Sequence, residues 1–134
     1  MRGTIVCDVT DPLAGPTAAE FARALGARLG LRVVLVSVGA HRTLDAITRG
    51  VAHEAETRVA DGDHAETLAR VAAEEGADLV IVGARPAGLG GRNLHGALAR
   101  ELEAATPVPV LVAPPSTRKR SDRRLSVPAD AVTR

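Results

Sequence analysis

Aromatic residues and cysteines are almost absent from this chain of 134 residues. Phe21 is its one aromatic residue and Cys7 its one cysteine. The scarcity of aromatic rings argues against a binder of single-stranded nucleic acid, because such proteins stack bases on aromatic side chains. A single cysteine excludes an internal disulfide, which is typical of a cytoplasmic protein.

Long apolar runs are also missing. No stretch approaches the ~20 residues that a membrane span needs, and the N-terminus lacks the charged and apolar regions of a signal peptide. We therefore expect a soluble cytoplasmic protein that does not bind membranes. Apolar residues still make up 46 % of the chain. That is enough for the core of one domain built from alanine, valine, leucine and isoleucine.

The net charge of +1 conceals two parts of opposite charge. Residues 1–113 carry 11 basic and 14 acidic side chains, whereas residues 114–134 carry 6 basic and 2 acidic ones. Because the second part has no sustained apolar period, we predict a domain over 1–113 and a disordered basic tail over 114–134. The basic cluster at 118–124 could attract nucleic acid or an acidic partner. A solubilising extension is the simpler interpretation, and we expect no nucleic-acid partner.

Short apolar segments rich in β-branched residues alternate with segments of helical periodicity. The predicted strands are Thr4–Val9, Leu31–Val38, Glu56–Ala60, Asp78–Val82 and Val108–Val112. The predicted helices are Pro16–Leu29, His41–His53, His64–Glu75 and Arg92–Ala105. This alternation predicts an α/β fold of three layers, in which helices cover an open parallel sheet of five strands. The third strand is the most polar, so we place it near an edge.

Local signals predict how two of the helices begin and end. Thr17 is a candidate cap for the first helix, whose apolar stripe ends at Leu29. Asp63 is a good cap for the third helix, and Glu66 completes a capping-box pattern. Gly76 ends that helix.

Two loops are candidates for a ligand site. In an open α/β sheet, ligands bind beyond the carboxyl ends of the strands, where the strand order reverses. One loop is Val9–Pro12, and the other is the glycine-rich stretch Gly83–Gly96. Glycines allow close approach of the backbone to a phosphate, and the following helix directs its free N–H groups at an anion. The stretch is neither a Walker loop nor a Rossmann fingerprint, so by itself it fits an anion site and a merely flexible connection equally well.

Several segments, in the right order, resemble the universal stress protein family over residues 3–113. They are Thr4–Cys7, Leu35–Val38, Gly62–Ala65, Asp78–Arg85 and Pro109–Val112. The resemblance implies a Rossmann-like sheet of the adenine nucleotide alpha hydrolase type, with strand order 3-2-1-4-5. It also implies a homodimer, for which Val108–Val112 is the candidate edge.

One branch of that family binds ATP through the motif Gly-x2-Gly-x9-Gly-Ser/Thr. On this chain the motif falls on Gly83, Pro86, Gly96 and Ala97, so the spacing is intact while two residues differ. Pro86 has no N–H to offer a phosphate, and Ala97 lacks the hydroxyl group. The nucleotide-binding members also carry an acidic residue after the first strand, where this chain has Thr10.

The resemblance therefore implies an adenine-nucleotide site, with ATP and Mg²⁺ as the candidate ligand. Aliphatic side chains would line the adenine pocket, and backbone N–H groups of 83–98 would hold the phosphates. Arg85 or Arg92 could supply a phosphate contact that the altered motif lacks. The predicted site residues are Val9, Thr10, Asp11, Val38, Gly83, Arg85, Gly88, Gly91, Gly96, Ala97 and Leu98.

Catalytic and metal-binding patterns are not found. The four histidines form no metal signature, and no catalytic dyad or triad is evident. We interpret the chain as a non-catalytic regulatory module of the stress response, in which any ATP hydrolysis would be slow and incidental. The alternative is a nucleotide-free interaction protein of the same fold, acting through protein partners. Pro86 and Ala97 favour this alternative, whereas the preserved spacing of Gly83 and Gly96 favours nucleotide binding.

Overall fold

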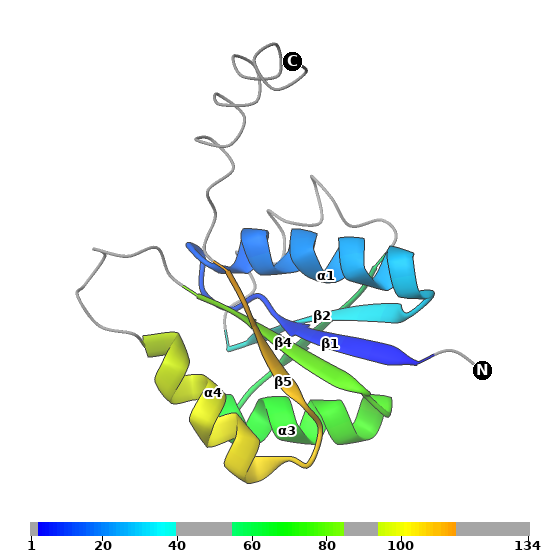
Figure 1. Cartoon of the computed structure of the whole chain (residues 1–134). Coiled ribbons are helices and arrows are strands. Elements are labelled where there is room, and N and C mark those ends of the chain that lie inside the picture. Colours follow the sequence, from blue (N-terminus) through cyan, green and yellow to red (C-terminus); the bar gives the residue numbers. More distant parts are fainter. Residues whose placement is uncertain (1–2, 40–54, 85–93, 115–134) are drawn as a thin grey trace, which may run out of the picture.

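Five parallel strands form one sheet in the computed structural model, which describes residues 3–39, 55–84 and 94–114 (Figure 1). The strands are β1 (Thr4–Asp8), β2 (Arg32–Val38), β3 (Glu56–Ala60), β4 (Leu79–Gly83) and β5 (Val110–Ala113). Their order is β3-β2-β1-β4-β5, so the fold class, the strand order and the edge position of the third strand are confirmed.

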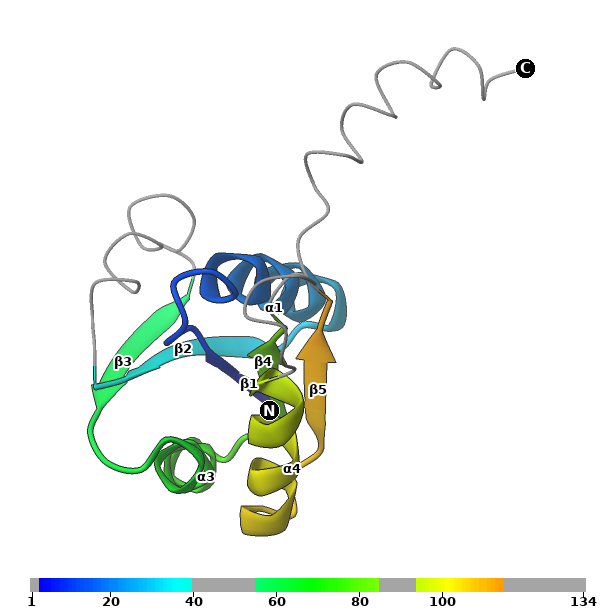
Figure 2. The same ribbon diagram turned by 90° about the vertical axis from the view of Figure 1, so that its left-hand side faces the viewer.

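Three helices are described: α1 (Gly15–Leu29), α3 (His64–Glu75) and α4 (Leu94–Ala105). The predicted helix His41–His53 lies outside the described residues. Helix α1 covers one face of the sheet, whereas α3 and α4 lie side by side on the other (Figure 2). Successive strand residues point to opposite faces. Ile5 and Cys7 therefore pack towards α1, and Val6 packs towards α3 and α4.

The start of α1 differs from the prediction. No side chain caps this helix, so the assignment of Thr17 as its cap is wrong. Asp11 forms the turn instead. Its carbonyl oxygen accepts from the N–H of Gly15 at 2.6 Å, and its carboxylate accepts from the N–H of Leu13 at 2.8 Å. The turn therefore satisfies backbone donors at the helix start that a capping side chain would otherwise bind.

The apolar stripe of α1 also differs. Leu29, its expected last member, is 61 % exposed. Ala18 and Ala22, which belong to the predicted stripe, are buried as expected, and Gly26 is buried beside them. A Cβ at Gly26 would lie 2.6 Å from the Cγ2 atom of Val33, so the glycine permits close packing of α1 on β2.

The ends of α3 agree with the sequence. The side chain of Asp63 accepts a hydrogen bond from the N–H of Glu66 at 3.1 Å, which confirms the predicted cap. Gly76 ends the helix with φ of 67°, a left-handed conformation that favours glycine.

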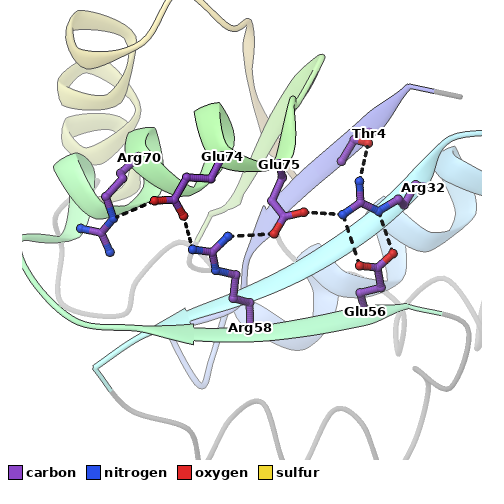
Figure 3. Close-up of polar contacts among 7 residues, drawn as sticks. All are labelled: Thr4, Arg32, Glu56, Arg58, Arg70, Glu74 and Glu75. Atoms are coloured by element: carbon purple, nitrogen blue, oxygen red, sulfur yellow. Dashed lines mark hydrogen bonds and ion pairs between the residues drawn. The ribbon is translucent and has the colours of Figure 1, made fainter. Parts of the chain in front are cut away.

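A chain of ion pairs joins the last turns of α3 to strands β2 and β3 (Figure 3). In order, its members are Glu56, Arg32, Glu75, Arg58, Glu74 and Arg70. Glu75 is central, since it pairs with both Arg32 and Arg58, and its distance to Arg58 Nη1 is 2.8 Å. The guanidinium of Arg58, and then that of Arg32, lowers the pKa of Glu75 below its usual value.

We expect Glu75→Gln to reduce the free energy of unfolding by about 1–2 kcal/mol near neutral pH, because it weakens two charged hydrogen bonds. Glu56→Gln makes the same charge change at a side chain that is 58 % exposed, and should cost about 0.5 kcal/mol or less. The part due to Glu75 should vanish as the pH falls through its lowered pKa, where the carboxylate is protonated. Urea titrations of both variants test this, and equal losses would contradict a central role for Glu75.

Candidate functional site

The strand order reverses between β1 and β4, so the carboxyl ends of these two strands form the switch point of the sheet. Val9 continues β1 beyond its last residue and is fully buried, and its N–H donates to the carbonyl of Val36 at 2.8 Å. Val38 ends β2 and is half-buried, and Gly83 ends β4. Three of the predicted site residues therefore lie at the carboxyl edge of the sheet.

Gly83 lies close to Ala14, the residue before the first residue of α1. A Cβ placed on this residue would lie 2.8 Å from the carbonyl oxygen of Ala14 and 2.9 Å from its Cβ. Any larger residue would push the loop between β1 and α1 away from the end of β4. The glycine therefore has a packing role in addition to the phosphate role that the motif predicts.

Thr10 is held by hydrogen bonds to the ends of β1 and β2. Its hydroxyl donates to Oδ1 of Asp8 at 2.6 Å and accepts from the N–H of Val38 at 2.9 Å. The N–H of Thr10 also donates to the same carboxylate oxygen, at 3.1 Å. Thr10 therefore links the ends of β1 and β2 at the carboxyl edge of the sheet.

The other oxygen of Asp8 contacts a histidine. Oδ2 of Asp8 lies 3.0 Å from Nε2 of His64, the first residue of α3. The Asp8 side chain is 4 % exposed and that of His64 is 39 % exposed. The hydrogen bond that His64 donates to Asp8 raises the pKa of His64, and the charges of Asp63 and Glu101 act in the same direction.

Sequence reasoning missed this pair, although a signal for it was available. Asp8 ends the first strand, and His64 follows the turn after the third strand. In a parallel sheet both positions lie at the carboxyl edge, so the topology marks them as candidates for a contact without specifying one.

The pair should stabilise the fold in a pH-dependent way. Because the pKa of His64 is raised, its contribution is complete below the ordinary value of about 6.5 and is lost as the pH rises through the folded-state pKa. Since the ring is partly solvated, we expect His64→Gln to cost at most about 1 kcal/mol near pH 6 and less near pH 9. Urea titrations at both pH values measure the difference, and a cost independent of pH would contradict it.

Asp11 lies in the turn before α1, where its carboxylate accepts from the N–H of Leu13. The other predicted residues divide into two groups. Leu98 is buried in the core between α4 and the sheet, and Ala97 is half-buried one residue earlier. Gly96 lies in the first turn of α4. The second group lies outside the described residues and consists of Arg85, Gly88 and Gly91, together with the motif residue Pro86 and the alternative phosphate ligand Arg92.

Cys7 lies in the middle of β1 with no exposed surface. Burial, followed by the nearby charge of Asp8, raises the pKa of its thiol well above the usual value. This cysteine therefore packs as a small apolar side chain.

Two further properties concern only the residues that the structure describes. Among 3–39, 55–84 and 94–114, no group of three or more histidine, cysteine, aspartate or glutamate side chains is arranged to hold a metal ion. Within the same ranges, every helix is too short or too polar to cross a membrane.

The family model and the similar solved structures both point to one protein family. A model of the universal stress protein family matches residues 44–114, more than half of the chain. No curated protein matches the chain at a significant level.

Solved structures with the same fold include a universal stress protein in complex with cAMP. It is 18 % identical, the match covers 86 % of this chain and 98 % of that one, and the TM-score is 0.64. UspA from Lactobacillus plantarum is 16 % identical over 84 % of this chain and 99 % of its own, with a TM-score of 0.58. A universal stress protein from Archaeoglobus fulgidus is 18 % identical. The match covers 84 % of this chain and 93 % of that one, and the TM-score is 0.55.

Proposed function

The chain belongs to the universal stress protein family, and we propose that it is a regulatory module that binds an adenine nucleotide at the switch point between β1 and β4. The observation that carries this proposal is the contact between Gly83 and Ala14, which brings the loop after β1 against the end of β4. The two segments that would bind base and phosphate are thereby neighbours.

The chemistry of these segments suits such a ligand. Val38, which is half-buried, supplies aliphatic surface for the base, and the N-terminal turn of α4 offers free N–H groups and the positive end of a helix dipole to phosphate. The similar structure that contains cAMP supports an adenine nucleotide as the ligand class. ATP with Mg²⁺ is the candidate that the motif favours, and the phosphates themselves would carry the metal.

The module would act through its bound state and would not depend on catalysis. The hydroxyl of Thr10 is engaged as a donor by Asp8 and as an acceptor by Val38. It is therefore occupied in a structural role and poorly suited to attack a phosphate. We propose a cytoplasmic stress-response function, in which a protein partner recognises the nucleotide-bound form.

A homodimer through β5 is part of this proposal. This edge strand exposes Leu111 and Val112, which are 36 % and 40 % accessible. Unpaired edge strands readily pair with another chain, and a second copy would cover both side chains.

We further propose that residues 114–134 form a basic tail outside the nucleotide-binding domain of residues 1–113.

An amide NMR titration tests the ligand and its position together. Addition of cAMP, or of ATP with Mg²⁺, should shift the amide signals of Val9, Thr10, Val38 and Gly83. The amide of Glu75, in the ion-pair chain at the opposite end of α3, should not move and serves as the internal control. Absence of shifts at millimolar ligand would overturn nucleotide binding and favour the nucleotide-free interaction protein. Shifts centred elsewhere would overturn the proposed position.

A further inference from the structure

Acidic groups dominate the carboxyl edge of the sheet. Among the described residues at this edge, the carboxylates belong to Asp8, Asp11, Asp61 and Asp63. His64 is the one basic side chain whose surroundings are described there. A phosphate that binds at the switch point therefore meets a negative field, and His64 is the described group best able to oppose it.

His64 lies at the edge of the sheet where the phosphate is expected. Helices α3 and α4 lie on the same face of the sheet, and both begin at its carboxyl edge (Figures 1 and 2). The charge of Glu101, one turn beyond Ala97 in α4, is close enough to raise the pKa of His64. The imidazole therefore reaches the end of β1, one of the two strands of the switch point, from the face of the sheet that α4 also covers.

Asp8 fixes the imidazole in one orientation. Its buried carboxylate lies 3.0 Å from Nε2, so this nitrogen carries a proton and donates. The other ring nitrogen, Nδ1, then acquires the second proton when the imidazole becomes cationic. A partly exposed ring, anchored at one nitrogen by a buried carboxylate, can offer its other nitrogen to an anion.

Resting on the nucleotide site proposed above, we propose that His64, oriented by Asp8, binds the phosphate of the nucleotide through Nδ1–H. This contact supplies a donor where Pro86, in the motif, has no N–H. Asp8 is the positioning residue, since it acts on the ligand through His64. Among the residues that the structure describes at this edge, His64 is the charged donor available to phosphate.

The contact depends on pH. The charged groups that face His64 are Asp8 from β1, Asp63 from its own helix terminus and Glu101 from α4, and all three favour the cation. Phosphate binding is therefore strongest below the pKa of His64 and weakens as the pH rises through it. Adenosine, which has no phosphate, should bind equally well at pH values below and above the pKa of His64.

The test compares cAMP with adenosine by calorimetric titration at about pH 6 and about pH 9. The phosphodiester of cAMP keeps one negative charge throughout, so a change in its affinity reports on the protein. We expect the ratio of cAMP to adenosine affinity to fall about tenfold between the two pH values, the range of one hydrogen bond to a charged group.

Three variants separate the phosphate contact from a structural role. At about pH 6, His64→Gln should lower the ratio of cAMP to adenosine affinity to the value that the parent protein has at about pH 9. His64→Lys should keep this ratio high at both pH values. Asp8→Asn should move the midpoint of the pH profile to lower pH, because the anion that favours the imidazolium is removed. Arg70→Gln removes an exposed positive charge from the same helix and should leave the ratio unchanged. Thermal melting of each variant shows whether it is folded.

The outcomes also distinguish the two proposals. If cAMP and adenosine both bind, and their ratio is the same at both pH values and in His64→Gln, the role of His64 is overturned while the nucleotide site stands. If neither ligand binds the folded protein at millimolar concentration, the nucleotide site fails and the role of His64 fails with it.

Discussion

Replacing Pro86 by glycine and Ala97 by serine together should tighten the binding of ATP by at least about tenfold. The glycine restores a backbone N–H and the serine adds a hydroxyl, so two donors to phosphate are regained in the motif. A hydrogen bond to a charged group contributes about 1.5–3 kcal/mol. Two such bonds correspond to two to four decades of affinity, and the conformational freedom of the new glycine reduces that gain.

Calorimetric titration with ATP and Mg²⁺ measures the change. Ala104→Ser is a suitable control, because it adds the same hydroxyl at an exposed position in the last turn of α4. The control should bind ATP as the parent does. Unchanged affinity in the double variant would mean that the motif has been placed wrongly on this chain.

The substitution Gly96→Val should abolish nucleotide binding while the protein stays folded. Gly96 lies in the first turn of α4, where a branched side chain would prevent the close approach of phosphate to the backbone. Valine has a higher helix propensity than glycine, so the helix itself should tolerate the change.

Ala104→Val provides the matched control for this variant, since it introduces valine in the same helix away from the carboxyl edge. Thermal melting of both variants shows whether the fold survives. Parent-like affinity in a folded Gly96→Val protein would place the ligand away from the start of α4.

The centre of the sheet could be predicted from the sequence because strands β1, β2 and β4 are buried on both faces. Every residue of β1 is buried, and the resulting apolar run is visible in the sequence without any knowledge of the fold. The strand order itself came from the family resemblance. At β5 the predicted start was two residues early, because Pro107 and Pro109 supply no N–H to a sheet ladder.

Helix α1 was harder to predict because its packing depends on small residues. Periodicity favoured the large side chain of Leu29 as a core residue, yet that residue is exposed. The buried side contains Ala18 and Ala22 as predicted, and Gly26 adds a close approach to β2 that periodicity did not indicate. Glycine carries no hydrophobic signal, so this contact becomes visible only when the helix is placed on the sheet.

The candidate site was predictable in position but not in its polar contacts. The topology places Val9, Val38 and Gly83 at one edge, as expected from their positions after strands. The contact of Asp8 with His64 joins residues far apart in sequence. It depends on the rotation of α3 about its axis, which no local pattern specifies. The link between Thr10 and Val38 likewise requires the register of β1 against β2.

Nucleotide binding is the central claim, and release of ligand from the purified protein tests it most directly. The protein is denatured, the supernatant is examined by chromatography for adenine nucleotides, and the emptied, refolded protein is titrated with ATP and Mg²⁺. We expect a co-purified adenine nucleotide or, if the site is empty on purification, saturable binding of ATP that Gly96→Val removes. Absence of any released nucleotide, together with no heat and no thermal shift at millimolar ATP, would contradict the claim.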